Sequence, residues 1–229
     1  MDVPQEALVS RLRDIQKGGF PNYFGPQRFG HKNSNFEHGR ALLANPRFKH
    51  SRDDKEKIFL SSVRSWLFNH LLSRRIEEGN WCAALKDDLL ILDGTNSFFR
   101  AEGHEDELER RLREADIHLS GPLWGTPMRG YSESLEARER DWLSPFRGEC
   151  VRLEQLDVKM TRRALRAMAK NLVWAWQDKS TLSMEFELES GVFATSLLRE
   201  LVSVIDRGGN PHKDNPSGLA IREFGQLGD

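Results

Sequence analysis

The chain has 229 residues, 38% of them hydrophobic, and its 13 Phe and 6 Trp supply enough apolar mass for one large core or two small ones. Its 34 basic and 35 acidic residues nearly cancel, which excludes a globally basic nucleic-acid binder and leaves only local patches for such contacts. No apolar run approaches the roughly 20 residues that cross a bilayer, and the N-terminus lacks the apolar core of a signal peptide. We therefore expect a cytoplasmic protein with no membrane partner.

The first thirty residues predict a helix followed by an ordered loop. Apolar residues at spacings of three to four predict an amphipathic helix over 3–17, and the pair Gly18 and Gly19 ends it. Residues 20–30 combine prolines, glycines and four aromatic rings in a pattern that fits neither a helix nor a strand. We expect this segment to be a loop that its aromatic rings hold in place.

Two further helices are predicted before residue 80. A short helix over 35–45 has Asn35 as its expected N-cap, and Pro46 prevents its extension. A longer helix over 53–78 repeats its apolar residues on one face, and Asp53 suits the positive N-terminal end of its dipole.

The middle of the chain predicts a strand and two charged helices. The apolar stretch 85–92 closes on an Asp-Gly pair, which indicates a strand that leads into a turn. Residues 104–116 and 131–143 predict weakly amphipathic helices, separated by a loop over 121–127 that contains two prolines.

The C-terminal part changes to an alternating pattern. Segments 162–168, 172–176 and 184–188 alternate in side-chain type, and the short links between them favour three strands in an antiparallel meander. A helix over 191–205 follows, and the Gly-rich, polar tail predicts a disordered end. The fold class is therefore α+β, and the element order suggests that the first helix packs with the final strands while the mostly helical middle is an insertion.

Charge is unevenly distributed despite the near-zero total. Residues 26–57 carry eight Lys or Arg against four acids, whereas residues 101–120 carry seven acids against three Arg. A cationic stretch next to Asn22 and the aromatic loop has the ingredients for phosphate contact and base stacking. The alternative is that these charged side chains only form the solvent-exposed faces of helices.

The sequence contains no motif of the common enzyme classes or of a metal site. Glycine-rich phosphate loops, zinc-protease helices, serine nucleophile elbows and Cys-x-x-Cys pairs are absent. Cys82 and Cys150 lie far from each other and from any His at ligand spacing, so no metal is expected. Asp87 and Asp88 adjoin in a predicted strand and would point to opposite faces, which disfavours an acid–base pair.

Four blocks in the chain resemble those of one family, in the same order. They are GFPNYFG with QRFG over 19–30, SVRSWLFN over 62–69, LWGT over 123–126 and GVFATSLLREL over 191–201. Together they resemble the TruD family of tRNA pseudouridine synthases, and the likeness extends over nearly the whole chain.

The resemblance implies a specific domain arrangement. Residues 1–20 correspond to a remnant helix of the pseudouridine synthase domain, and 21–163 to its mostly helical inserted TRUD domain. Residues 164–206 correspond to the C-terminal strands and helix of the antiparallel synthase sheet, and 207–229 to a flexible tail. By this resemblance the synthase sheet is only partly present here.

The resemblance also implies an activity and a set of contacts. The family isomerises uridine-13 in the D-arm of tRNA to pseudouridine with an Asp nucleophile and no cofactor, after the base leaves its stack. Phe193 matches the aromatic ring that packs on the flipped uracil, and its alternative role is a core ring. The expected RNA-binding residues are Asn22, Arg28, Lys32 and Arg199.

The catalytic motif of the family is missing from these residues. In the family, a Gly-x-Lys-Asp-x-x-Ala motif that holds the nucleophile and a Gly-Asn-x-Phe motif precede the aromatic loop, and neither occurs here. The most similar segment, over 85–89, follows the loop and lacks the Gly and Ala of the motif, so we reject it. Asp2 and Asp14 also lie outside any such motif. We expect no catalytic residue in the chain.

Three interpretations follow from this departure. The first is a truncated synthase that is inactive alone or that needs a separate N-terminal half. Without such a partner, the chain is expected to be a monomer. The second is a non-catalytic tRNA-binding module, and the third is a truncated product with no biochemical role. The absence of part of the sheet also predicts an open strand edge and an exposed apolar face around Trp174, Trp176, Met184 and Phe186.

Overall fold

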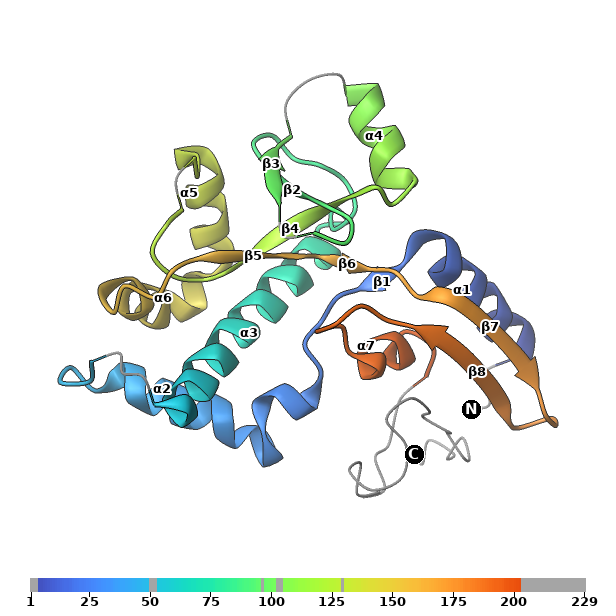
Figure 1. Ribbon diagram of the computed structural model, residues 1–229, viewed down its shortest axis with the longest axis horizontal. Coiled ribbons are helices and arrows are strands. Elements are labelled where there is room, and N and C mark those ends of the chain that lie inside the picture. The colour runs from blue at the N-terminus through green and yellow to red at the C-terminus, as the bar shows by residue number, and fades with distance from the viewer. Residues whose placement is uncertain (1–3, 50–52, 96, 102–104, 129, 203–229) are drawn as a thin grey trace. The chain divides into compact units, whose positions relative to one another are not determined.

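The computed structural model describes residues 4–49, 53–95, 97–101, 105–128 and 130–202 (Figure 1). Its described residues fall into two compact units. The discontinuous unit combines those of Met1–Phe20 with those of Ala167–Asp229, and the middle unit comprises those of Pro21–Arg166. The tail predicted over 207–229 lies outside the described residues. The fold is α+β, with helices and antiparallel sheets, as the sequence predicts.

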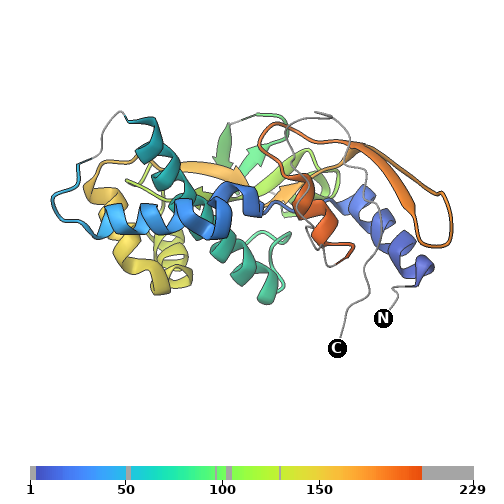
Figure 2. The same cartoon turned by 90° about the horizontal axis from the view of Figure 1, so that it is seen from below.

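The discontinuous unit is built from both ends of the chain. It contains α1 (Gln5–Gly18), β7 (Lys170–Trp176), β8 (Leu182–Glu187) and α7 (Ala194–Arg199). Figure 2 shows α1 and α7 lying along one side of the β7–β8 hairpin. Their buried side chains form one core, which consists of Leu12, Ile15, Phe20, Ala167, Ala169, Leu172, Leu182, Leu197 and Leu198. The predicted packing of the first helix with the C-terminal strands is confirmed.

The predicted three-strand meander is wrong. The first predicted strand is divided between β5 (Thr161–Ala164) and β6 (Arg166–Ala167), and β5 pairs with a strand of the middle unit. Within the described part of the chain, β7 and β8 pair only with each other, antiparallel and with Trp174 opposite Met184. Each strand of this hairpin therefore has one edge that no described strand pairs with, as predicted.

The apolar face expected on these strands is not exposed. The four predicted side chains are half-buried because they pack against the core that α1 and α7 complete; they are Trp174, Trp176, Met184 and Phe186. The outward side chains of the hairpin are mostly polar, and its one large apolar exception is Val173, 56% exposed. The expectation assumed that a missing part of the sheet would leave the inner face of β7 and β8 exposed to solvent, but α1 and α7 pack against this face.

Two helices of the middle unit test the predicted helix starts. In α3 (Asp54–Glu77), the carboxylate of Asp53 accepts from the backbone N–H groups of Lys55 and Glu56, so the predicted start is confirmed. In α2 (Ser34–Ala44), the N-cap is Asn33, which makes no side-chain cap bond. The predicted capping role of Asn35 is wrong, because the helix begins before it.

The aromatic loop enters α2 through two short turns. They are the 3-10 turns η1 (Pro26–Phe29) and η2 (His31–Asn33). Further along the chain the unit contains α4 (Glu105–Arg113), α5 (Glu133–Trp142), the 3-10 turn η3 (Ser144–Phe146) and α6 (Arg147–Gln155). The sequence did not predict α6, which packs against α2.

A four-stranded antiparallel sheet accompanies these helices, in the order β3-β2-β4-β5. Its other strands are β2 (Leu89–Leu92), β3 (Phe98–Arg100) and β4 (Ile117–Leu123). The strand predicted over 85–92 begins only at Leu89, because Asp87 has a left-handed backbone with φ of 67°. The loop predicted over 121–127 begins inside β4, since Gly121, Pro122 and Leu123 pair with β5.

The unit boundary falls within two short paired strands, β1 (Phe20–Pro21) and β6. In the part of the chain that the structure describes, no helix has the length and apolar character that a membrane span requires.

Candidate functional site

The aromatic loop is attached to α3 by a side chain that imitates a peptide group. The amide of Asn69 accepts from the backbone N–H of Phe24 at 2.8 Å and donates to the carbonyl of the same residue at 2.9 Å. The hydroxyl of Tyr23 bonds to that of Ser73 at 2.9 Å, one turn further along the helix. The block over 62–69 therefore positions the block over 19–30.

Aromatic rings complete this attachment. Phe29 meets Trp66 edge to face with ring centroids 5.3 Å apart, and Phe36 stacks on the same Trp66 at 4.4 Å. Phe24 meets Phe68 edge to face at 5.6 Å. The prediction of an ordered loop that its rings hold in place is confirmed, although it did not foresee the role of Asn69.

Arg64 connects α3 to a third block, over 123–126. Its guanidinium donates to the carbonyls of Trp124 at 2.8 Å, Leu123 at 2.7 Å and Lys159 at 2.8 Å. Gly125 lies so close to the next segment that an added Cβ would fall 2.0 Å from the carbonyl oxygen of Val158. Three sequence blocks thus meet around one helix.

Three arginines gather where these blocks meet. Arg28 donates to Ser65 at 3.1 Å and to Ser61, and the guanidinium of Arg163 lies 4.1 Å from the ring centroid of Phe24. Burial and, after it, repulsion from Arg28 lower the pKa of Arg64 and of Arg163 to about 10. Burial also lowers the pKa of Arg28. All three remain cationic at neutral pH.

For two of these cations, the described residues supply no acidic partner. Among the residues that the structure describes, Arg28 and Arg64 bond only to hydroxyls and backbone carbonyls and form no ion pair. A partly buried cation without a counter-charge leaves a strong local positive potential. This part of the middle unit is therefore suited to bind an anion.

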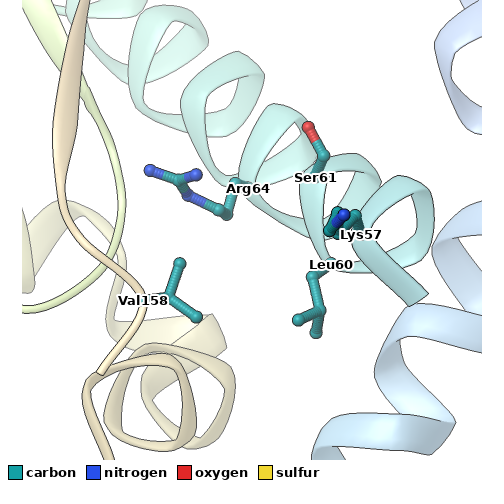
Figure 3. Close-up of a pocket in the computed structure, with 5 residues that line it drawn as sticks. All are labelled: Lys57, Leu60, Ser61, Arg64 and Val158. Atoms are coloured by element: carbon teal, nitrogen blue, oxygen red, sulfur yellow. The ribbon is translucent and has the colours of Figure 1, made fainter. Parts of the chain in front are cut away.

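A pocket of about 270 Å³ opens beside this group (Figure 3). Its lining residues are Lys57, Leu60, Ser61, Arg64 and Val158. The first four come from successive turns of α3, and Val158 comes from the segment that leads into β5. In Figure 3 the side chains of Leu60 and Val158 approach each other across the pocket.

The structure places three predicted RNA-binding residues in the middle unit, in different surroundings. Asn22 is buried: its amide donates to the carbonyl of Ala164 at 2.9 Å and accepts from Arg163. Arg28 is half-buried in the arginine group, and Lys32 is exposed with a left-handed backbone. Asn22 and Arg28 are thus both neighbours of Arg163.

The other two predicted residues belong to the discontinuous unit. Phe193 is the half-buried N-cap residue of α7, and Arg199 lies exposed in the last turn of the same helix. This helix is shorter than the predicted 191–205, since it begins after Phe193 and ends at Arg199. The roles predicted for both residues stay predictions.

Sequence reasoning missed most of the pocket. The cationic stretch 26–57 includes Arg28 of the arginine group and Lys57 of the pocket, whereas Ser61, Arg64 and Arg163 lie outside it. The available signal was the position of Arg64 inside the block over 62–69. No local pattern indicated that Arg64 and Arg163 would lie near Arg28.

The rejected carboxylates have structural partners. Asp88 is buried, and its two oxygens accept from Arg75 at 2.9 Å and Arg138 at 2.6 Å. Asp87 accepts from the hydroxyl of Ser134. Asp88 also accepts from the backbone N–H of Leu85 at 2.9 Å and thereby stabilises the turn before β2.

Comparison with known proteins gives consistent matches. Residues 48–201 match the family model of tRNA pseudouridine synthase D (TruD). The chain is 36% identical over 203 residues to tRNA pseudouridine synthase D of Methylococcus capsulatus and 39% identical over 214 residues to that of Xanthomonas campestris pv. campestris. These alignments cover 89% and 88% of this chain but 57% and 58% of the two relatives.

A solved structure shares the fold. The crystal structure of a provisionally assigned tRNA pseudouridine synthase D (TruD) from Methanosarcina mazei superposes with a TM-score of 0.68 at 19% identity. The match covers 87% of this chain and 65% of that one. The chain therefore spans somewhat over half the length of the curated relatives that it matches.

Proposed function

The chain belongs to the tRNA pseudouridine synthase D (TruD) family, and from this premise we propose that it is the RNA-binding portion of a tRNA pseudouridine synthase. The substrate is tRNA, and the product of the complete enzyme is pseudouridine at uridine-13 in the D-arm. The chain acts in the cytoplasm and needs no cofactor. The nucleophile comes from residues outside these 229.

The observation that carries the proposal is the pair Arg28 and Arg64, which are partly buried and have no acidic partner among the described residues. A phosphate backbone supplies the negative charge that the described residues do not place there. The aromatic loop holds Arg28, and the helix that anchors this loop contains Arg64, so one rigid assembly presents both charges.

The two units have separate roles in this proposal. The middle unit is the inserted TRUD domain and grips the tRNA, with Arg28 and Lys32 near the phosphate backbone. Asn22 supports this surface through Arg163. The discontinuous unit is part of the synthase domain, in which Phe193 packs on the flipped uracil and Arg199 contacts RNA.

Isomerisation by the chain alone is not expected. Breaking the glycosidic bond and reattaching the base through carbon requires the nucleophilic Asp of the family, and the motif that carries it does not occur in this sequence. Asp88 cannot replace it, because two arginines bind its carboxylate. Activity therefore depends on a separate segment that supplies the motif. Without that segment, the chain is a monomer.

A second candidate is a tRNA-binding module without catalysis. The same observation favours it, since the arginine pair needs no nucleophile in order to bind phosphate. The two candidates differ in what happens when the N-terminal segment of a family member is added.

The deciding experiment measures pseudouridine in unmodified tRNA by chemical labelling, because the isomer has an unchanged mass. We expect no product from the 229-residue chain and product after addition of a polypeptide that contains the Gly-x-Lys-Asp-x-x-Ala motif. Product from the chain alone would overturn the exclusion of a local nucleophile. Binding of tRNA that stays unproductive with the added polypeptide would favour the binding module.

A further inference from the structure

We propose that the pocket lined by Lys57, Ser61 and Arg64 is a phosphate subsite that holds one backbone phosphate of the bound RNA. The RNA source of the phosphate rests on the proposed function, whereas the binding of a phosphate group rests on the pocket alone. The subsite anchors the RNA and reads no base, because its polar groups suit a phosphate rather than the edge of a base.

The three polar groups lie on one face of α3. Positions 57, 61 and 64 are separated by four and three residues, which places them in line along the helix. Figure 3 shows Ser61 and Arg64 on successive turns, with Lys57 one turn before them. The pocket of about 270 Å³ is many times the roughly 30 Å³ that a water molecule occupies in the liquid, so a phosphate group has room to enter.

Arg64 is held in place, and some of its hydrogen-bond donors have no acceptor among the described residues. Its Nε and one terminal nitrogen, Nη2, make all of its hydrogen bonds to the described residues, with the carbonyls of Leu123, Trp124 and Lys159 and the hydroxyl of Thr161 as acceptors. The other terminal nitrogen, Nη1, has no acceptor among the described residues. A guanidinium fixed on one side and unpaired on the other is preorganised for an oxygen ligand.

Ser61 is also oriented as a donor. Its hydroxyl oxygen accepts a hydrogen bond from Arg28, and within the described part of the chain it donates to no acceptor. The hydroxyl hydrogen can therefore point to a phosphate oxygen. Arg28 thereby acts on the subsite through Ser61 and adds a second positive charge behind it.

Lys57 supplies a mobile charge at the rim. Its ammonium pairs with Asp54 at 2.7 Å, but both side chains are at least half exposed. Exposed pairs of this kind are weak, so an arriving phosphate can compete for the ammonium. Leu60 and Val158 form apolar walls, which strengthen the electrostatic attraction inside the pocket.

The first test titrates the full chain with inorganic phosphate and follows the Ser61 amide and the Arg64 Nε–H by NMR, against sodium chloride at equal ionic strength. We expect saturable shifts with phosphate only. Lys57→Gln should weaken this binding, while Lys55→Gln should not, because Lys55 lies two residues away on a different face of the same helix. The absence of saturable shifts, or equal weakening by both variants, would overturn the subsite.

The second test measures tRNA affinity across a range of salt concentrations. Lys57→Gln should reduce the slope of log affinity against log salt by about 0.7 to 0.9, the contribution of one phosphate contact, and Lys55→Gln should leave it unchanged. If phosphate binds but Lys57→Gln leaves the tRNA slope unchanged, the ligand is free phosphate and the RNA assignment is wrong. If the unsubstituted chain binds no tRNA, the proposed function fails, and the phosphate titration still decides the pocket.

Discussion

Buried charges in the middle unit are stabilised by partners from distant parts of the chain. Asp88 accepts from Arg75 and Arg138, and the carboxylate of Glu139 binds the guanidinium of Arg162 through both of its oxygens. The side chains of Arg162 and Glu139 are each 1% exposed. Such pairs are costly to break, because removal of one partner leaves the other charge buried and uncompensated. By contrast, Arg28 and Arg64 have no acidic partner among the residues that the structure describes.

The role of Asp88 can be tested by neutralising its carboxylate. Asp88→Asn should lower the free energy of unfolding by about 3 to 5 kcal/mol, because Arg75 would stay buried without its counter-charge. Chemical denaturation followed by tryptophan fluorescence measures the change. Asp87→Asn is the matched control, since the side chain of Asp87 accepts from Ser134 near the surface and pairs with no arginine among the described residues. Similar small losses in both variants would contradict the structural role of Asp88.

Close approaches between segments determine how the elements of the middle unit assemble. An added Cβ on Gly39 in α2 would lie 2.4 Å from the carbonyl oxygen of Phe59 in α3, so the two helices approach closely there. Gly125 likewise allows a close approach between the end of β4 and Val158. Each glycine is needed for the space it leaves and not for a left-handed backbone.

Substitution of Gly125 tests this requirement. Gly125→Ala should destabilise the protein by about 3 kcal/mol, because a Cβ 2.0 Å from the carbonyl oxygen of Val158 forces the two segments apart. Gly148→Ala is the control: nothing lies within 4 Å of its added Cβ, and its place in α6 favours Ala by roughly 0.5 to 1 kcal/mol. Thermal unfolding of both variants measures the contrast. A neutral Gly125→Ala would show that the segments can separate freely.

The turn of the β7–β8 hairpin contains a carboxylate that depends on pH. Asp178 accepts from the backbone N–H of Ser180 at 2.7 Å and of Thr181 at 2.8 Å. The bond from the Ser180 backbone, followed by those from the hydroxyls of Thr181 and Ser180 and from the Thr181 backbone, lowers the pKa of Asp178 to about 2 from an ordinary value of 3.8. A lowered carboxylate pKa stabilises the folded state above pH 3.8, and this stabilisation is lost as the pH falls towards 2.

Asp178→Asn isolates this contribution, because the amide oxygen still accepts the turn bonds but does not titrate. The stability difference between the original chain and the variant should shrink as the pH falls from 4 to 2 and stay constant above that window. Unfolding temperatures between pH 2 and 6 measure it. Parallel curves across the window would mean that the carboxylate is not held in its charged form.

At the scale of the whole molecule, the discontinuous unit depends on residues from both ends of the chain. Leu12 and Ile15 of α1 share one core with Leu172 of β7 and Leu197 of α7. Hydrogen bonds add to this packing, since Gln16 donates to the carbonyl of Leu172 at 2.9 Å. The contacts join segments more than 150 positions apart, so this unit cannot form until the middle of the chain has been synthesised.

Truncation of Leu12 tests whether the unit is cooperative. Leu12→Ala should cost about 2 to 5 kcal/mol, because the side chain is fully buried, and should increase hydrogen exchange in β7, β8 and α7 as well as in α1. Arg13→Ala, at an exposed position of the same helix, is the control and should change exchange little. An increase confined to α1 would show that the helix contributes nothing to the strands.

The sequence by itself determined the elements whose signals are local. Asp53 marked the start of α3, the two glycines after residue 17 marked the end of α1, and the aromatic rings indicated an ordered loop. It also determined the family, because four blocks occur in order along the chain. Charge density identified a cationic stretch over 26–57, which includes Arg28. These features depend on capping, backbone conformation or composition, each of which acts within a few residues.

Only the tertiary structure decided the contacts that span long distances in sequence. The alternating pattern at Thr161–Ala164 is equally compatible with β7 and with β4 as a neighbour, and it pairs with β4. Nothing local indicated that Arg64 would reach Trp124, or that the pocket would form beside it. The physical reason is that strand pairing and buried charge are determined by which surfaces pack together, and the packing brings together residues that no short window of sequence contains.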